Sequence, residues 1–481
     1  MTQPTANIAS HLTAMASRQP DRRAVVMARD GRGLTYAQLD QQSDAVARGL
    51  IEVGIGAGVR TVLLAPPSLD FFVLIFALFK CGAVTVCVDP GIGPKYLKRC
   101  LGEAEPDAFV GVAHAQLARR VLGWAPATIA TNVRVGPWAP LLGCSLGMDD
   151  LRQIGATSSH ALPEATPDDT AAILFTSGST GPPKGVVYTH GNFDAQVRAL
   201  RDAFDIQPGE IDLSTFPLFA LYVPAMAMTA VIPHMECTRP GRVDPRNVIG
   251  PIETFGVTNL FVVPALLKRV GEYGRANDLR LKSLKRVISA GAPVSPRVIE
   301  TFSSMLSDGV EIHTPYGATE TIPVSTIASR EILNDTAAQT AVGRGVCVGR
   351  PTPGMDVRVI RITDDALNEW DDALLAPAGV IGEIVVRGPQ VTRSYFNRDE
   401  ATRLAKIAAP QFGDGAFFHR MGDVGYLDDA GRLWMCGRKS QRVVTSDGDL
   451  YTVPCEAVFN TLPGVARPAL VGVQMNGKVE P

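Results

Sequence analysis

The chain has 481 residues, of which 46% are hydrophobic and 20% charged, and its net charge is −2. That length exceeds one ordinary core, so two or three subdomains of a soluble globular protein are expected. A near-neutral balance without a basic cluster gives nucleic-acid binding no electrostatic support.

The chain shows no sign of export or of a membrane span. The longest apolar run, Phe71–Phe79, is too short to cross a bilayer. The N-terminus lacks a basic segment followed by a hydrophobic one, and the eight cysteines include no Cys-x-x-Cys pair. We therefore expect a cytoplasmic protein with reduced thiols.

Two helices near the N-terminus carry start and stop signals. Thr35 and Gln38 form a capping box before an amphipathic pattern that stops at Gly54. Ser68 caps a second helix that contains the apolar run and ends near Gly82.

Short β-branched runs alternate with such helical patterns over most of the chain. This alternation predicts an α/β fold with mostly parallel sheets covered by helices on both faces. The predicted strands include residues 61–64, 84–88, 109–112, 171–175, 260–263 and 287–288.

A loop rich in hydroxyls and glycines follows the predicted strand 171–175. It contains Thr176, Ser177, Gly178, Ser179, Thr180, Gly181 and then Lys184. Backbone N–H groups near glycine, side-chain hydroxyls and a lysine charge together suit a polyphosphate. The alternative is a flexible Ser/Gly turn. A Walker A motif is excluded because Gly185, and not Ser or Thr, follows Lys184.

This loop resembles the phosphate loop of the adenylate-forming superfamily, which contains acyl-CoA synthetases, adenylation domains and luciferases. Residues 316–320, Tyr-Gly-Ala-Thr-Glu, resemble a second element of that family. The resemblance implies that Tyr316 and Gly317 bind adenine and that Thr319 contacts the α-phosphate. It also implies that Glu320 and Thr176 hold Mg²⁺, and that Lys184, Thr319 and Glu320 are catalytic. Read alone, the pentapeptide could be a turn with a capping threonine.

Three further segments complete the resemblance. Gly291 and Ala292 match the turn that cradles adenine, although an ordinary strand-to-helix connection would look the same. Asp423 matches the carboxylate that accepts bonds from the ribose hydroxyls, and Arg438 matches an arginine that reaches the ribose. Met421 stands where the family usually has threonine.

The domain organisation is predicted from changes in the pattern of expected helices and strands along the sequence. Residues 1–436 would form the N-terminal adenylate-forming domain, with a small β-rich subdomain from about 354 to 436. Residues 437–481 would begin an α+β C-terminal lid that is incomplete. The family places a catalytic lysine on this lid, and Lys478 comes too early in the lid to be assigned that role.

At three positions this sequence differs from a common acyl-CoA ligase, and these differences indicate a particular branch of the superfamily. Ala220 replaces a frequent histidine beside the acyl pocket, Ser440 replaces the hinge aspartate, and Val444 replaces a common lysine. The whole chain is most similar to the β-lactone synthetases of bacterial long-chain olefin biosynthesis.

That resemblance implies a ligase that uses ATP and Mg²⁺ to convert a long-chain 2-alkyl-3-hydroxyalkanoic acid, through an acyl-AMP, into a β-lactone. It also implies association with other enzymes of the olefin pathway. His190 and His419 are candidates for the base that accepts the 3-hydroxyl proton, although each is more simply structural. The alternatives are a long-chain fatty acyl-CoA ligase and a nucleotide-binding partner subunit with weak catalysis.

Overall fold

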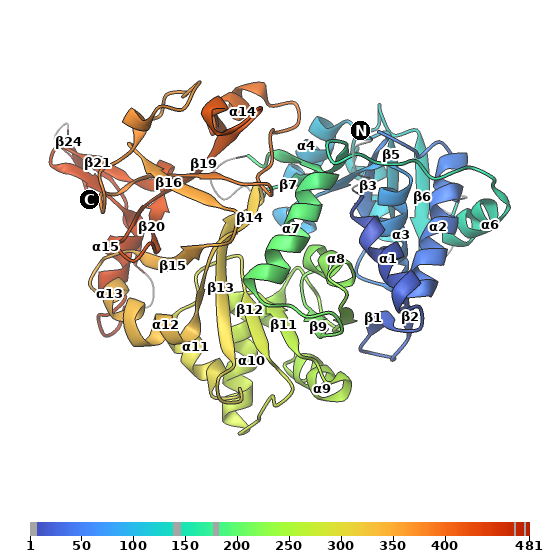
Figure 1. Ribbon diagram of the computed structural model, residues 1–481, viewed down its shortest axis with the longest axis horizontal. Helices are drawn as coiled ribbons and strands as arrows, with labels where there is room; N and C mark the ends of the chain where they lie inside the picture. Colours follow the sequence, from blue (N-terminus) through green and yellow to red (C-terminus); the bar gives the residue numbers. More distant parts are fainter. Residues whose placement is uncertain (1–6, 138–145, 177–181, 466–467, 476–477) are drawn as a thin grey trace.

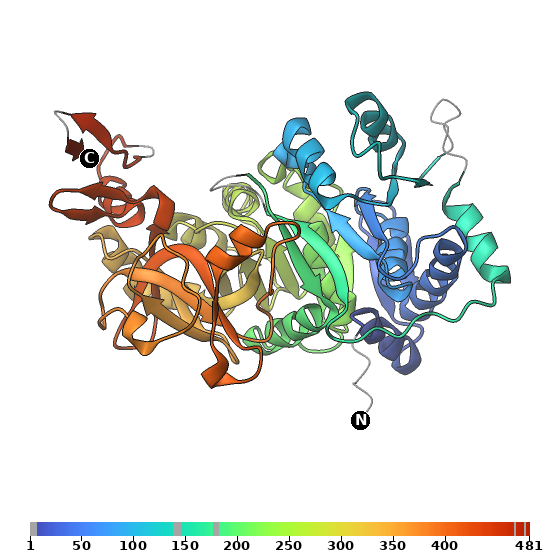
Figure 2. The same cartoon turned by 90° about the horizontal axis from the view of Figure 1, so that it is seen from above.

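The computed structural model describes residues 7–137, 146–176, 182–465, 468–475 and 478–481. Two large sheets organise these residues. Figures 1 and 2 show the N-terminal part at one side of the molecule and the C-terminal segments at the opposite side. In the described part of the chain, no helix is long and apolar enough to cross a membrane.

The first sheet has six described strands, and all neighbouring pairs are parallel except β7 with β8. Its spatial order is β6 (Thr131–Val135), β5 (Ala108–Val112), β3 (Arg60–Leu64), β4 (Val84–Cys87), β7 (Thr170–Phe175) and β8 (Gly185–Thr189). The helices of this half are α1 (Ala9–Arg18), α2 (Tyr36–Glu52), α3 (Leu69–Lys80), α4 (Pro94–Ala104), α5 (Ala113–Leu122) and α6 (Met148–Thr157).

The predicted helix starts are confirmed. The Thr35 hydroxyl accepts from Gln38 N while the Gln38 side chain accepts from Thr35 N, so α2 begins with a complete capping box. The Ser68 hydroxyl accepts from Phe71 N at 3.1 Å, and α3 follows with its apolar residues buried.

The second sheet contains fourteen strands within the described residues and changes character at β13. Its mainly parallel half runs β13 (Glu311–Ala318), β12 (Arg286–Ser289), β11 (Asn259–Val262), β9 (Ile211–Ser214), β10 (Thr229–Ile232), β1 (Arg23–Met27) and an antiparallel edge, β2 (Gly33–Thr35). Its antiparallel half runs β14 (Thr321–Ala328), β15 (Val346–Pro351), β20 (Leu433–Arg438), β19 (Phe417–Leu427), β17 (Gly382–Arg387) and β16 (Asp356–Ile360), with β18 (Lys406–Ala408) beside β19.

The expected α/β architecture is confirmed, and the β-rich segment continues the large sheet through β14 and β15. Helices α7 (His190–Ala203) and α8 (Pro217–Ala225) lie in the middle of the molecule (Figure 1). One hydrophobic core includes Phe72 of α3, Phe193 of α7 and Phe219 of α8. The remaining longer helices are α9 (Arg246–Phe255), α10 (Pro264–Ala276), α11 (Pro296–Ser303), α14 (Asp399–Ala405) and α15 (Thr452–Phe459).

The segments after β20 form small separate pieces at one end of the molecule (Figure 2). They are two hairpins, β21 (Val443–Thr445) with β22 (Gly448–Leu450) and β23 (Val473–Met475) with β24 (Lys478–Glu480), and the helix α15. Since β20 runs to Arg438, the residue proposed for the ribose lies on the strand that leads into these segments.

Helices α2 and α6 approach closely through two glycines. A Cβ at Gly155 would lie 1.7 Å from Ala45 O, and one at Gly49 would lie 2.2 Å from Leu151 O. We expect Gly155→Ala to lower the free energy of unfolding by about 1–3 kcal/mol, because the helices must move apart. Chemical denaturation measures this change.

Gly102 of α4 is the matched control. A Cβ there meets nothing within 4 Å, so Gly102→Ala should raise the free energy of unfolding by up to about 1 kcal/mol through helix propensity. Equal effects at Gly155 and Gly102 would contradict the packing argument.

A buried carboxyl in the large sheet makes stability depend on pH. Asp212 on β9 accepts from Ser214 Oγ at 2.5 Å and from Asn259 Nδ2. Burial raises the pKa of Asp212 to about 7, against the opposing effect of these hydrogen bonds. Because the folded state holds the proton more tightly, stability is highest below the unfolded value near 3.8 and is lost as pH rises through about 7.

We expect Asp212→Asn to flatten the dependence of stability on pH between about 4 and 7, removing a slope of up to about 1.4 kcal/mol per pH unit. Denaturant titrations at several pH values measure the slope. Asp149→Asn, at an exposed position on α6, is the control and should leave the slope unchanged. An unchanged slope in Asp212→Asn would contradict this assignment.

Candidate active site

The phosphate loop connects β7 to β8, and its two ends are fastened to each other. Thr176 N donates to Lys184 O at 3.0 Å, and Lys184 N donates to the Thr176 hydroxyl at 3.1 Å. These bonds continue the pairing of Phe175 with Gly185 and close the neck of the loop. The proposed phosphate-binding residues Ser177, Gly178, Ser179, Thr180 and Gly181 lie outside the described residues, and their roles remain predictions.

The Lys184 side chain lies over the ring of a residue that is distant in sequence. Its ammonium nitrogen lies 4.9 Å from the centre of the Tyr395 ring. The Tyr395 hydroxyl donates to Glu320 Oε1 at 2.6 Å. The fold thereby places the positive charge proposed for the phosphates beside the carboxylate proposed for the metal, with one aromatic ring between them.

Thr319 and Glu320 form the tip of the hairpin between β13 and β14, where Ala318 pairs with Thr321. The turn is tight, since a Cβ at Gly317 would lie 2.7 Å from Thr321 O. The turn interpretation of this motif is therefore right about its backbone, and a turn is compatible with a role in binding. The carbonyl of Thr319 accepts from the Tyr188 hydroxyl.

The main chain of Glu320 is held in place by hydrogen bonds from Thr392. Its carbonyl accepts from Thr392 N at 2.9 Å and from the Thr392 hydroxyl at 3.0 Å. Thr392 and Tyr395 belong to the segment between β17 and α14, which holds both the main chain and the side chain of Glu320. A rigid hairpin tip suits a group that must act at a defined position.

Asp423, Tyr316 and Arg438 come together at the other end of the site. Strand register places Asp423 opposite Arg438, and Arg438 Nη1 lies 2.8 Å from Asp423 Oδ1. The Tyr316 hydroxyl donates to Asp423 Oδ2 at 2.6 Å. Burial raises the pKa of Asp423, and the positive charge of Arg438 opposes that rise.

The Asp423 carboxylate fits a ribose diol. Its Oδ1 is buried and, among the described residues, carries the ion pair with Arg438 but no well-aligned hydrogen bond. Such an oxygen can accept from a ligand hydroxyl. The charge of Glu320 raises the pKa of both Asp423 and Tyr316, so the two groups of residues form one electrostatic site.

Gly291 and Ala292 lie just beyond the end of β12 and are exposed. Gly291 has φ of +94°, a conformation that favours glycine, and a Cβ there would meet open space. A backbone turn with room beside it is compatible with a planar ligand. Adenine binding at these residues remains a prediction.

The donor set fits Mg²⁺ on an ATP complex better than a dedicated metal centre. No group of three or more His, Cys, Asp or Glu side chains gathers within the ranges that the structure describes. Mg²⁺ on a nucleotide needs one or two carboxylates, with phosphate oxygens and water as the other ligands. Glu320 provides one carboxylate, and no hydrogen bond from a described residue occupies its Oε2. The Thr176 hydroxyl already accepts from Lys184 N, and its role as a ligand remains a prediction.

The two histidine candidates occupy structural positions. His190 begins α7 with 1% of its surface exposed, and burial lowers its pKa to about 4. His419 is buried, its Nδ1 lies 3.2 Å from Ala405 O, and burial lowers its pKa well below 6.5. These environments support the structural interpretation of both residues.

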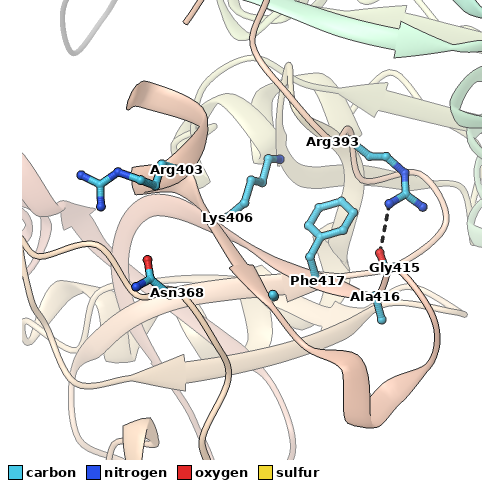
Figure 3. Close-up of a pocket in the computed structure, with 8 residues that line it drawn as sticks. Asn368, Arg393, Arg403, Lys406, Gly415, Ala416 and Phe417 are labelled. Atoms are coloured by element: carbon cyan, nitrogen blue, oxygen red, sulfur yellow. Dashed lines mark hydrogen bonds between the residues drawn. The ribbon is translucent and has the colours of Figure 1, made fainter. Parts of the chain in front are cut away.

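Lys406 is a feature that the sequence analysis missed. Its ammonium donates to Thr392 O and lies 5.2 Å from the centre of the Phe417 ring. Burial lowers the pKa of Lys406 to about 7, and the charge of Glu320 opposes that shift. Figure 3 shows Lys406, Phe417 and Arg393 around a pocket. No local pattern around Lys406 distinguishes it from a surface lysine.

Comparison with known proteins shows the family of this chain. A family model described as AMP-binding enzyme matches residues 12–396. The chain therefore belongs to this family, and the sequence-based expectation of an adenylate-forming ligase is confirmed.

Two relatives are particularly similar. The chain is 48% identical to the olefin β-lactone synthetase of Xanthomonas campestris pv. campestris, over 99% of this chain and 86% of that protein. It is 49% identical to the olefin β-lactone synthetase of Stenotrophomonas maltophilia, over 99% of this chain and 87% of that protein.

Among solved structures, the O-succinylbenzoate coenzyme A synthetase of Bacillus subtilis, in complex with ATP and magnesium ion, has the same fold. The TM-score is 0.75 at 21% identity, over 97% of this chain and 87% of that one.

Proposed function

We propose that this chain is an ATP-dependent β-lactone synthetase that acts on a long-chain 2-alkyl-3-hydroxyalkanoic acid. The observation that carries the proposal is the 48–49% identity to two olefin β-lactone synthetases over 99% of the chain. The site supports the first half of the reaction, because its charged groups match the parts of ATP.

The first step forms an acyl-AMP. A carboxylate oxygen of the acid attacks the α-phosphorus of ATP, and the bond from that phosphorus to pyrophosphate breaks. Both reactants are anions, so Lys184 and the loop N–H groups offset the negative charge that develops at the phosphates. Mg²⁺ bound by Glu320 and the phosphate oxygens would neutralise further charge.

The nucleoside is held at the other end of the site. Asp423 would accept hydrogen bonds from the ribose hydroxyls, and Arg438 keeps that carboxylate charged and oriented. Thr319, at the rigid hairpin tip, would contact the α-phosphate. Because Asp423 and Arg438 lie on strands and Thr319 lies on a hairpin tip held by hydrogen bonds, these groups are positioned before the ligand binds.

The second step closes the ring. The 3-hydroxyl oxygen attacks the acyl carbonyl, the bond to AMP breaks, and the hydroxyl proton is released. The nucleophile belongs to the same molecule, which provides the high effective concentration that a strained four-membered ring requires. Coenzyme A is not needed.

Helix α8 is the proposed wall of the acyl pocket. Ala220 is fully buried there, and Phe219 stacks on Phe261 with ring centres 3.8 Å apart. Alanine at this position leaves more room than the histidine found in many relatives, which suits an acid with two alkyl chains.

Product analysis tests the proposal. The protein is incubated with ATP, Mg²⁺ and a synthetic 2-alkyl-3-hydroxy acid, with and without coenzyme A, and the products are identified by mass spectrometry. A β-lactone with AMP and pyrophosphate is expected in both cases. The matching acid without the 3-hydroxyl should give acyl-AMP and no lactone.

The other outcomes favour the alternatives. A coenzyme A thioester without lactone would identify an acyl-CoA ligase. Failure to release pyrophosphate with any acid, in a protein that still binds ATP, would identify a nucleotide-binding partner subunit.

A further inference from the structure

A chain of buried hydrogen bonds connects helix α8 to the hairpin tip at Thr319. The Tyr222 hydroxyl of α8 donates to Gln196 Oε1 of α7. Gln196 Nε2 donates to the Tyr188 hydroxyl at 3.2 Å, and the Tyr188 hydroxyl donates to Thr319 O. Figure 1 shows α7 running between α8 and β14, which begins just after the hairpin tip.

One carbonyl determines which group donates and which accepts in each of these three hydrogen bonds. Thr319 O can only accept, so the Tyr188 proton must point toward it. The Tyr188 oxygen then accepts from the Gln196 amide nitrogen, which turns the amide oxygen toward Tyr222. The Tyr222 proton must in turn point at that oxygen. Each bond polarises the next, so the three bonds support one another.

The aromatic packing holds the same groups in place. The Phe193 ring lies 4.9 Å from the Tyr188 ring and 6.0 Å from the Tyr222 ring, measured between centres. Gln196 is fully buried, and Tyr188 is 2% exposed. The oxygen and the nitrogen of the buried Gln196 amide both form hydrogen bonds, so a flipped amide would lose both of them. Displacement of Tyr222 must therefore disturb the bonds of Gln196 to Tyr188 and of Tyr188 to Thr319.

We propose that Tyr222, Gln196 and Tyr188 form a positioning relay that couples the acyl-pocket helix to Thr319 and Glu320 of the nucleotide site. The assignment of α8 to the acyl pocket rests on the proposed function. Binding of an acid against α8 would then favour the hairpin position that suits ATP, and nucleotide would favour acid to the same extent.

The relay is tested first without any substrate. Hydrogen–deuterium exchange is measured by mass spectrometry on peptides that cover residues 316–324 in wild type, Tyr222→Phe and Tyr188→Phe. Both variants keep the ring and lose the hydroxyl. We expect exchange at the hairpin to be about fivefold faster or more in each variant, because one buried hydrogen bond is removed.

Tyr36→Phe is the matched control. The Tyr36 hydroxyl is also buried and donates to Met228 O at 2.8 Å, with Pro224 O of α8 at 3.3 Å, but it has no part in the relay. We expect a similar loss of stability and unchanged exchange at residues 316–324. If Tyr222→Phe leaves that exchange unchanged, or if Tyr36→Phe accelerates it equally, the relay is refuted.

A double-mutant cycle gives a second readout. The affinity for AMP is measured by calorimetry in Tyr222→Phe, Tyr188→Phe and the double variant. We expect about three- to tenfold weaker binding in each single variant, and a double variant no weaker than Tyr188→Phe alone. Additive effects would refute the relay. Neither measurement depends on lactone formation, so failure of the proposed function is distinguished from failure of the relay.

Discussion

Replacement of Lys184 by alanine is expected to lower the rate of carboxylate-dependent pyrophosphate release by about 10²–10³-fold. The ammonium of Lys184 is held 4.9 Å from the centre of the Tyr395 ring, beside the Glu320 carboxylate that the ring hydroxyl contacts. In the proposed mechanism the lysine charge offsets the negative charge that develops on the phosphates, and alanine removes the lysine charge. A coupled pyrophosphate assay measures the rate.

The control is Lys268→Ala, which removes an exposed lysine from α10 and should leave the rate unchanged. Thermal unfolding of Lys184→Ala should match that of wild type, since the side chain is not a core residue. A rate within threefold of wild type would contradict the assignment of Lys184 to the phosphates.

Replacement of Arg420 by methionine is expected to lower the free energy of unfolding by about 3–5 kcal/mol. Arg420 is buried on β19 and donates to both oxygens of the buried Glu383, at 3.1 and 2.6 Å. It also donates to Asp365 O at 2.7 Å and Leu404 O at 3.2 Å. Methionine fills a similar volume and leaves the carboxylate and three carbonyls, those of Asp365, Leu404 and Thr363, without these donors.

Lys439 Nζ lies 3.3 Å from Glu383 Oε2 and partly compensates the Glu383 charge when Arg420 is replaced. We therefore expect the loss in free energy of unfolding to lie toward the lower end of the stated range. Chemical denaturation measures the loss, and Arg420→Met with Glu383→Gln should recover part of it because no charge is left buried. The exposed pair of Arg403 with Glu400 is the control, and Arg403→Met should lower the free energy of unfolding far less than Arg420→Met does. Similar losses at Arg420 and Arg403 would contradict the role of burial.

The Arg420 result also separates two roles within one motif. Arg420 lies three residues before Asp423, the residue proposed for the ribose. In the fold, Arg420 faces Glu383 and holds β19 in place, while Asp423, three residues later on the same strand, faces Tyr316 and Arg438. Side chains alternate along a strand, and the register of β19 against β17 shifts between Arg420 and Val424, so structural and binding residues are separated within one short segment.

Most individual elements could be predicted because their signals are local. Thr35 and Ser68 cap helices through bonds to residues three positions later, which the sequence displays directly. The strand before the phosphate loop was also expected, since a short apolar run bounded by turn residues is typical of a buried strand. These predictions needed no knowledge of distant parts of the chain.

The joining of the β-rich segment to the large sheet was not predicted. It depends on the pairing of β14 with β15 and of β15 with β20, and strand order leaves no mark on the sequence of either strand. The predicted boundaries at 354 and 436 follow a change in composition, and the large sheet continues across both, since β15 pairs with β20 and residue 436 lies within β20.

By itself, the sequence determined the class of this protein, an adenylate-forming ligase, and it supplied the proposed site residues Lys184, Glu320 and Asp423 in the order of that family. Only the tertiary structure decided how those groups are held. Tyr395 reaches Glu320 across 75 residues, Tyr316 reaches Asp423 across 107, and Tyr188 reaches Thr319 across 131. Residue types with reactive groups can be recognised one at a time, whereas contacts over such separations exist only once strand order and register have brought the segments together.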